Sequence, residues 1–273
     1  MTIFQSLFLG FIQGITEFLP VSSSGHLVII PYLLGWEIDA ESMFVFDVLV
    51  QVATMIGVIA YFWRDYVAIG KAMLKDLRWQ ANPQWEVRLG WLILIGTIPA
   101  GGAGLLLNDL IETAFNSPLA AASFLVGTAC LLFIAEKYRH NTRSLDQTTW
   151  KDALIIGLFQ TFALFPGLSR SGSTITGGML RGLQRTAAAR FAFLMALPIM
   201  LAAGLLSGKD LWFLPGAKSL LLLFLPGFIT SAVIGYLAIG WLLRFLMKYS
   251  LRAFAVYCLA LALITFVVYF IRL

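Results

Sequence analysis

The sequence predicts an all-α polytopic membrane protein built from two inverted repeats, each a re-entrant helix hairpin followed by three transmembrane helices. Three observations lead to this fold class. Hydrophobic residues make up 60% of the 273-residue chain and charged residues 12%, with a mean hydropathy of +0.87, whereas a soluble domain carries about 25% charged residues. Apolar runs of about 20 residues, enough to span a bilayer as a helix, recur along the chain. Finally, one proline-broken motif occurs twice.

The repeated motif covers residues 10–26 and 157–173. An offset of 147 superposes identical residues: Gly10 on Gly157, Gln13 on Gln160, Phe18 on Phe165, Ser22 on Ser169, Ser24 on Ser171 and Gly25 on Gly172. Each copy is an apolar helix, then a proline, then a loop rich in serine and glycine. Broken backbone at membrane depth is tolerated only where protein or a water-filled cavity satisfies its polar groups. Each copy therefore predicts a re-entrant hairpin and a candidate site.

The predicted elements follow the same order in both halves. In the first hairpin Pro20 ends a helix over residues 3–19, and the serines at 22–24 can cap a second short helix over about 25–34. The second hairpin covers about 152–182. Transmembrane spans are expected at about 43–63, 88–108, 118–137, 191–207, 219–241 and 250–271, with an interfacial loop over 64–87. Repeat 1 is thus about 1–140 and repeat 2 about 150–273, within one integral domain over 1–273. Gly10 and Gly14 would let another helix pack closely.

Three crossings separate the hairpins, so the second hairpin must enter the membrane from the opposite face. The repeat is therefore predicted to be inverted. Of the 19 Lys and Arg residues, fifteen fall on one predicted side, and only Lys209, Lys218 and Arg272 fall on the other, with Arg170 at a hairpin tip. The positive-inside rule then predicts that both termini lie outside the cytoplasm. Because the basic residues lie in short gaps between spans, they are interpreted as determinants of membrane topology. No nucleic-acid partner is expected.

The first loop holds a carboxylate, a serine run and a histidine. Gln13 and Glu17 are four residues apart and share one helix face, and a carboxylate in a membrane segment costs about 2.5–3.5 kcal/mol, so it is a functional candidate. Alternatively, Glu17 snorkels or caps the loop, and Gln13 is an interhelical hydrogen-bonding residue. His26 follows Ser22, Ser23 and Ser24. Beside hydroxyls and a carboxylate it can act as base or nucleophile toward phosphorus, the alternative being a structural histidine.

The second loop favours an anion. Arg170 lies at the predicted N-terminus of a half-helix among hydroxyl residues, which are Ser169, Ser171, Ser173 and Thr174. Helix N-termini attract anions, and the guanidinium fork matches phosphate oxygens. The alternative is that Arg170 only neutralises Glu17. Asp47 and Gln51, also four apart, are interpreted as interfacial or structural polar residues, with support of the site as the alternative.

With these residues the sequence closely resembles the integral-membrane undecaprenyl pyrophosphate phosphatases, also called bacitracin-resistance proteins. One family signature, Glu or Gln followed four positions on by Glu, matches Gln13 and Glu17; the other, Pro-Gly-x-Ser-Arg-Ser-x-x-Thr, matches Pro166 to Thr174; the serines ending in Gly25-His26 also fit. The resemblance extends over essentially the whole chain. It implies removal of the terminal phosphate of undecaprenyl pyrophosphate with a divalent cation, Mg²⁺ or Ca²⁺, which recycles the lipid carrier for peptidoglycan synthesis.

The resemblance also implies roles for individual residues. Glu17, His26, Ser23 and Arg170 would be catalytic, with His26 or Ser23 as nucleophile or base. Glu17 and Gln13 would hold the metal, although an amide is a poorer Mg²⁺ ligand than a carboxylate. The residues expected to bind the pyrophosphate are Arg170, Ser169, Ser171, Thr174, Ser22, Ser24 and Gly167. The expected location is the bacterial cytoplasmic (inner) membrane, in contact with its lipids, with the site opening to the outer face.

Two other classes of membrane protein compete with this interpretation. Type-2 phosphatidic acid phosphatases use similar Ser-Gly-His and Ser-Arg fragments, but their chemistry needs a histidine after the Ser-Arg motif, and no histidine follows His140. An inverted-repeat transporter or flippase of a polyprenyl phosphate is the serious alternative, because such carriers have broken helices that meet at the midplane.

Overall fold

Each half of the chain opens with two short helices joined by a turn. The computed structural model describes residues 1–76, 84–106, 117–140, 142–213 and 217–272. The short helices are α1 (Ile3–Phe18) and α2 (Ser23–Leu34) in the first half, and α7 (Trp150–Phe162) and α8 (Arg170–Leu180) in the second. The hydroxyls of Ser22 and Ser169 cap α2 and α8, and the cap of α2 by a serine was predicted from the sequence.

Three long helices follow each pair of short ones. They are α3 (Ala40–Lys75), α4 (Trp85–Leu106), α6 (Pro118–Lys137), α9 (Arg185–Phe213), α10 (Ala217–Lys248) and α11 (Arg252–Ile271), and a single 3-10 turn, η1 (Leu145–Gln147), precedes α7. In the described part of the chain these six helices are long and apolar enough to cross a membrane. The protein is therefore an all-α, multi-pass membrane protein, as its composition predicts.

Helix α3 extends beyond its predicted end. The prediction that an interfacial loop begins at residue 64 was wrong, because the helix continues to Lys75. Phe62, inside the helix, has non-helical dihedral angles. Residues 64–75 contain no proline, and their apolar side chains pack on α4, where a Cβ added to Gly90 would lie 2.2 Å from Sδ of Met73 and 2.9 Å from Cγ2 of Ile69. Arg78, one of the basic residues counted for the topology, and positions 107–108, the end of the span predicted over 88–108, lie outside the described residues.

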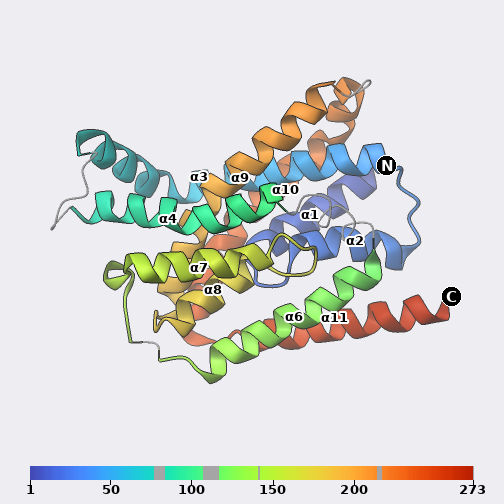
Figure 1. The fold of residues 1–273 in the computed structure, drawn as a ribbon. Coiled ribbons are helices and arrows are strands. Elements are labelled where there is room, and N and C mark those ends of the chain that lie inside the picture. Colours follow the sequence, from blue (N-terminus) through green and yellow to red (C-terminus); the bar gives the residue numbers. More distant parts are fainter. Residues whose placement is uncertain (77–83, 107–116, 141, 214–216, 273) are drawn as a thin grey trace.

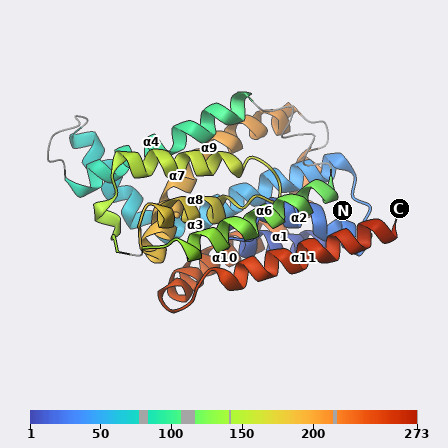
Figure 2. The same cartoon turned by 60° about the horizontal axis from the view of Figure 1, so that its bottom comes forward.

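The two halves pair with each other helix by helix. Helix α1 packs against α10 and α7 packs against α4, so the first helix of each half contacts the second long helix of the other half. Helix α3 meets α9, and α6 runs beside α11 (Figures 1 and 2). Both termini lie at the same end of the bundle in both views. This exchange of partners agrees with a twofold relation between the halves, while their inversion across the membrane stays a prediction.

Glycines permit the closest of these helix contacts. A Cβ added to Gly10 in α1 would lie 2.3 Å from the carbonyl oxygen of Gly227 in α10, and one added to Gly157 in α7 would lie 2.3 Å from that of Gly96 in α4. The close approach predicted for Gly10 is thus confirmed. Because Gly10 and Gly157 are equivalent positions of the repeated motif, both hairpins are anchored in the same way to the opposite half.

Candidate active site

The turns of the two hairpins meet in the interior of the protein. The hydroxyl of Ser22 accepts the N–H of Gly25 at 3.3 Å, which caps α2, and also the N–H of Gly167 at 3.1 Å. In return, the hydroxyl of Ser171 donates to the carbonyl of Leu19 at 2.9 Å. The two copies of the motif therefore form one structural unit, although 147 residues separate equivalent positions.

Unusual backbone at both turns makes this contact possible. Ser22 has a φ of 68°, and it is the one non-glycine residue in the described segments with positive φ; such a conformation is costly for an L-residue and persists where the surroundings hold it. Gly167 has a φ of 100°, and an added Cβ would lie 2.2 Å from the carbonyl oxygen of Ala121. Glycine is therefore required at position 167 by both conformation and space.

A threonine from α6 fixes the second turn. The hydroxyl of Thr128 donates to the carbonyl of Gly167 at 2.7 Å and accepts the N–H of Ser169 at 2.9 Å. Ser169 is the N-cap of α8, and its own hydroxyl accepts the N–H of Gly172 at 3.0 Å. Because the backbone on both sides of Leu168 is held in this way, the start of α8 has a defined position. Arg170 is the first residue of that helix.

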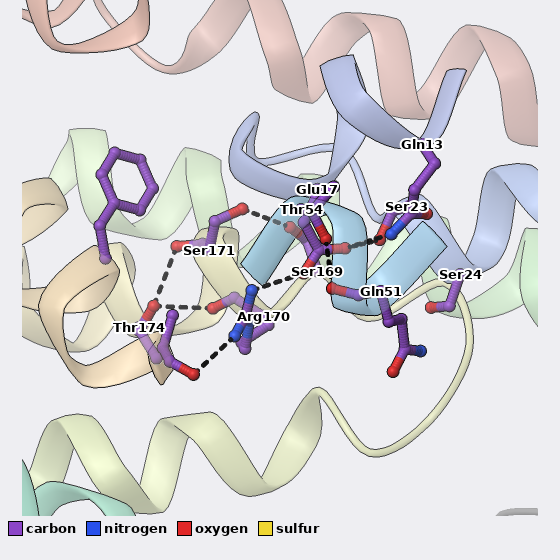
Figure 3. A network of polar contacts seen from close by, with 12 residues as sticks. Gln13, Glu17, Ser23, Ser24, Gln51, Thr54, Ser169, Arg170, Ser171 and Thr174 are labelled. Atoms are coloured by element: carbon purple, nitrogen blue, oxygen red, sulfur yellow. Dashed lines mark hydrogen bonds and ion pairs between the residues drawn. The ribbon is translucent and has the colours of Figure 1, made fainter. Parts of the chain in front are cut away.

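Glu17 connects the chemically active groups of the two motifs. Its Oε1 accepts from Nη2 of Arg170 at 2.5 Å, and its Oε2 accepts from Oγ of Ser23 at 2.5 Å and from Nε2 of Gln13 at 2.9 Å (Figure 3). The exposed fraction is 10% for the Glu17 side chain and 17% for that of Arg170. The structure thus brings together four of the predicted site residues around one carboxylate.

A cavity of about 160 Å³ lies beside this cluster. Its polar wall consists of Glu17, Ser22, Ser23, Ser24, Gln51, Ser169 and Arg170. Its apolar wall consists of Ala163, Leu168, Ile199, Met200 and Ala203, the last three from α9. The N-termini of α2 and α8 both reach the polar wall, and their backbone dipoles favour an anion there. The cavity therefore suits a molecule with an anionic group and an apolar part.

Three predicted phosphate-binding residues support the loops and do not line this cavity. The hydroxyl of Thr174 donates to the carbonyl of Arg170 at 2.7 Å, within α8. Ser171 and Gly167 make the contacts between turns described above. Ser22, Ser24, Ser169 and Arg170, which were also predicted to bind phosphate, do line it.

His26 is also outside the cluster around Glu17. It is 1% exposed, its Nδ1 lies 2.7 Å from the carbonyl oxygen of Ser22, and its Nε2 lies 2.7 Å from the hydroxyl of Tyr257. A carbonyl can only accept, so Nδ1 carries the proton and Nε2 accepts from Tyr257. The two rings stack at 5.6 Å between centroids with 5° between their planes. His26 therefore holds the backbone at Ser22 and is itself held by α11.

Comparison with known proteins shows the family of this chain. The family described as bacitracin resistance protein BacA matches residues 6–264. The chain belongs to this family. Its curated relatives include proteins named undecaprenyl-diphosphatase from Thermomicrobium roseum, 42% identical over 278 residues with 98% of each chain covered, and from Methanosphaera stadtmanae, 39% identical over 277 residues with 98% of each covered. A relative of the same name from Desulforudis audaxviator is 38% identical over the full length of both chains.

In this member of the BacA family, the donors available to a metal ion are few. Among the described residues no three His, Cys, Asp or Glu side chains lie close enough together to hold one. Gln13 is buried; its Nε2 donates to Glu17, and its Oε1 has no hydrogen-bond partner in the part of the chain that the structure describes. Glu17 is the carboxylate in the cavity wall, and Gln13, which contacts it, does not line the cavity. A hard cation here would therefore take most of its ligands from substrate phosphate and water, as Mg²⁺ can.

Sequence reasoning missed two residues of this BacA-family site and gave a third, Gln51, a role there only as an alternative. Thr128 and Tyr257 are single polar residues in apolar helices, and nothing in their sequence context indicates that they hold Gly167 and His26. Gln51 was interpreted as an interfacial or structural residue, with support of the site as the alternative, and its side chain lines the cavity. Its spacing of four from Asp47 was a signal of a polar face on α3, and the structure shows that this face reaches the cavity.

Proposed function

We propose that this protein is an undecaprenyl-diphosphatase, which removes the terminal phosphate of undecaprenyl pyrophosphate and releases undecaprenyl phosphate and inorganic phosphate. The observation that carries the proposal is the hydrogen bond of 2.5 Å between the hydroxyl of Ser23 and Glu17, whose other oxygen pairs with Arg170. A serine beside a carboxylate and an arginine, at two helix N-termini, is suited to phosphoryl transfer. The names of the full-length relatives support the substrate.

Ser23 is the proposed nucleophile. Its Oγ attacks the terminal phosphorus, Glu17 accepts the hydroxyl proton, and the phosphoanhydride bond breaks. The proton passes to the departing lipid phosphate. Water then attacks the phosphoserine, Glu17 accepts a proton from the water, and Oγ recovers a proton as inorganic phosphate leaves. Arg170 and the hydroxyls of Ser169 and Ser24 hold the phosphate oxygens, where charge develops.

His26 has a positioning role in this proposal. Both of its ring nitrogens are engaged, one by the Ser22 carbonyl and one by Tyr257, and it does not line the cavity. It therefore keeps the serine loop in the geometry in which Ser23 reaches Glu17. The geometry favours Ser23 over His26 as the group that attacks phosphorus.

A divalent cation, Mg²⁺ or Ca²⁺, belongs to the proposal. Gln13 and Glu17 would hold it together with substrate oxygens. When bound, such an ion neutralises charge on the pyrophosphate. The free Oε1 of Gln13 is the observation that supports a site here.

The apolar wall of the cavity explains how a lipid can be the substrate. The isoprenoid chain stays in the bilayer, so the protein must bind the headgroup inside the membrane, and Ile199, Met200 and Ala203 of α9 offer an apolar surface next to the polar wall.

We propose that both termini and the opening of the site face the outer side of the bacterial inner membrane, on the basis of the distribution of the basic residues. Recycling of the lipid carrier for peptidoglycan synthesis, and hence bacitracin resistance, would follow.

Phosphate release tests this function against the transporter alternative. Purified protein in detergent, given undecaprenyl pyrophosphate and Mg²⁺, should release inorganic phosphate, and the Arg170→Ala variant should not. If the parent protein binds the lipid but releases no more phosphate than Arg170→Ala, the enzyme is excluded and a polyprenyl-phosphate transporter or flippase becomes the better explanation.

A further inference from the structure

Gln51 lies outside both copies of the repeated motif, yet its side chain faces the candidate active site. It is on α3, it lines the cavity that also contains Ser24 and Arg170, and it is exposed. In Figure 3 its amide extends apart from the cluster around Glu17, and no interaction joins the two. Its backbone carbonyl accepts from Thr54, but among the described residues its amide makes no hydrogen bond.

This free amide distinguishes Gln51 from the glutamine at the base of the site. Nε2 of Gln13 is committed to Glu17 at 2.9 Å, and the residue is 1% exposed. Within the described segments the amide of Gln51 has no hydrogen-bond partner, although its neighbours Val50 and Thr54 on the same helix are fully buried. An amide at membrane depth costs free energy unless its polar atoms find partners. The cavity is where a partner for Gln51 can bind.

The chemistry of the opposite wall identifies that partner. Arg170 and the serines of both turns supply donors to the cavity, and two helix N-termini add partial positive charge. Phosphate oxygens accept several hydrogen bonds at once, and the Nε2 of a glutamine offers two N–H donors without adding charge. We propose that Gln51 is a substrate-binding residue that donates from Nε2 to a non-bridging oxygen of the lipid pyrophosphate. This rests on the proposed function and adds α3 as a third element of the phosphate site.

The charge of the cavity determines how substitutions at position 51 should behave. The polar wall contains one carboxylate, Glu17, which is paired with one guanidinium, Arg170. A carboxylate at position 51 would give this wall a net negative charge and repel a pyrophosphate, whereas an alanine would only remove the hydrogen bond. A structural role for the amide would not distinguish these two substitutions in this way.

The experiment compares Gln51→Ala, Gln51→Glu and a control on the same helix, Ile56→Ala. Ile56 is 44% exposed and does not line the cavity. For Gln51→Ala we expect kcat/KM for phosphate release to fall about 10- to 100-fold, mainly through KM, as for the loss of one hydrogen bond to a charged group. Gln51→Glu should lose more of its kcat/KM than Gln51→Ala, and inorganic phosphate should inhibit it less than it inhibits the parent protein. The control should match the parent, and all melting temperatures should agree.

Binding of the lipid pyrophosphate is measured separately, by the increase in melting temperature that it causes. This measurement tests the role of Gln51 independently of the proposed function. If the parent protein and Gln51→Ala bind the lipid equally well, and Gln51→Glu is inhibited by inorganic phosphate as strongly as the parent, Gln51 is not a substrate-binding residue. Absence of phosphate release by the parent contradicts the proposed function instead, and the binding comparison still decides the role of Gln51.

Discussion

Nη2 of Arg170 lies 2.5 Å from Oε1 of Glu17, although 153 positions separate these residues in the chain. The pair joins the two motifs and orients both of its members. We expect Glu17→Gln to lower kcat/KM for phosphate release by about 10²–10³-fold, because the proton acceptor is lost and Arg170 is left without its counter-charge. The double variant Glu17→Gln with Arg170→Gln should keep a fraction of the parental kcat/KM at least as large as the product of the fractions that the two single variants keep. A Glu17→Gln variant with more than a tenth of the parental activity would contradict this role.

Two neighbouring serines give a matched test of the nucleophile. Both line the cavity, but Ser23 contacts Glu17, whereas the hydroxyl of Ser24 lies 3.3 Å from that of Ser22. Ser23→Ala should lower kcat by at least about 10³-fold, as the loss of a nucleophile does. Ser24→Ala should lower kcat/KM only about 10- to 100-fold, as for the loss of one hydrogen bond to a charged group. Similar losses in both variants would rule out Ser23 as the attacking group. Steady-state phosphate release measures both.

The hydrogen bond between His26 and Tyr257 predicts a different pattern. Tyr257→Phe removes the donor to Nε2 and should lower the free energy of unfolding by about 1 kcal/mol, with little change in kcat. His26→Ala should lower both stability and activity, but it should keep more activity than Ser23→Ala. If His26→Ala instead has parental stability and is as inactive as Ser23→Ala, the histidine takes part in the chemistry. Thermal unfolding in detergent, together with phosphate release, separates these outcomes.

These residues also show how far the sequence could take the prediction. The repeated Gly, Gln and Ser positions, with one proline in each copy of the motif, predicted both hairpins, because proline and serine act locally on the backbone. A contact between Glu17 and Arg170 was considered only as the alternative interpretation of Arg170, and the structure contains this ion pair. The positions of His26 and Gln51 could not be predicted, because they depend on which face of α2 turns toward α11 and which face of α3 turns toward the cavity. The end of α3 was missed because its last turns pack on α4, a tertiary contact that no local signal indicates.

The glycine contacts between the hairpins and the opposite halves should be intolerant of any side chain. Gly10→Ala and Gly157→Ala each place a Cβ 2.3 Å from a backbone oxygen, so each should cost about 1–3 kcal/mol of unfolding free energy. Gly101→Ala is the control, since a Cβ there has nothing within 4 Å, and alanine in a helix is favoured by up to about 1 kcal/mol. Thermal unfolding in detergent tests this. Equal melting temperatures for the three variants would mean that the helix contacts are not tight.

A second ion cluster, at the start of α7, predicts a dependence on pH. Asp152 is fully buried, and its carboxylate accepts from Arg143 at 2.6 Å and from Arg181 at 2.7 Å. Burial raises the pKa of Asp152, but hydrogen bonds from Arg143, Thr149 and Arg181 outweigh burial and hold the pKa well below its ordinary value. A lowered folded-state pKa stabilises the fold above the unfolded pKa of about 4, and this stabilisation is lost as pH falls below that value.

Asp152→Asn should therefore lower the free energy of unfolding at pH 7 by about 1–3 kcal/mol. This is less than for a fully buried ion pair, because both arginines are partly exposed. The difference from the parent should shrink as the pH falls below about 4. Melting temperatures of both proteins between neutral and acidic pH measure it. A constant difference over that range would show that the charge of Asp152 is not responsible.

The bond from Gly167 to the hydroxyl of Ser22 also bears on the order in which the protein is made. Ser22 is synthesised early, but its partner leaves the ribosome 145 residues later. Until then the first hairpin has neither its neighbouring turn nor the arginine that pairs with Glu17. A nascent or truncated chain that ends before α8 thus contains Ser23 and Glu17 but no competent site. Phosphate release from the lipid pyrophosphate can begin only once the second hairpin, which brings Gly167 and Arg170, has joined the first.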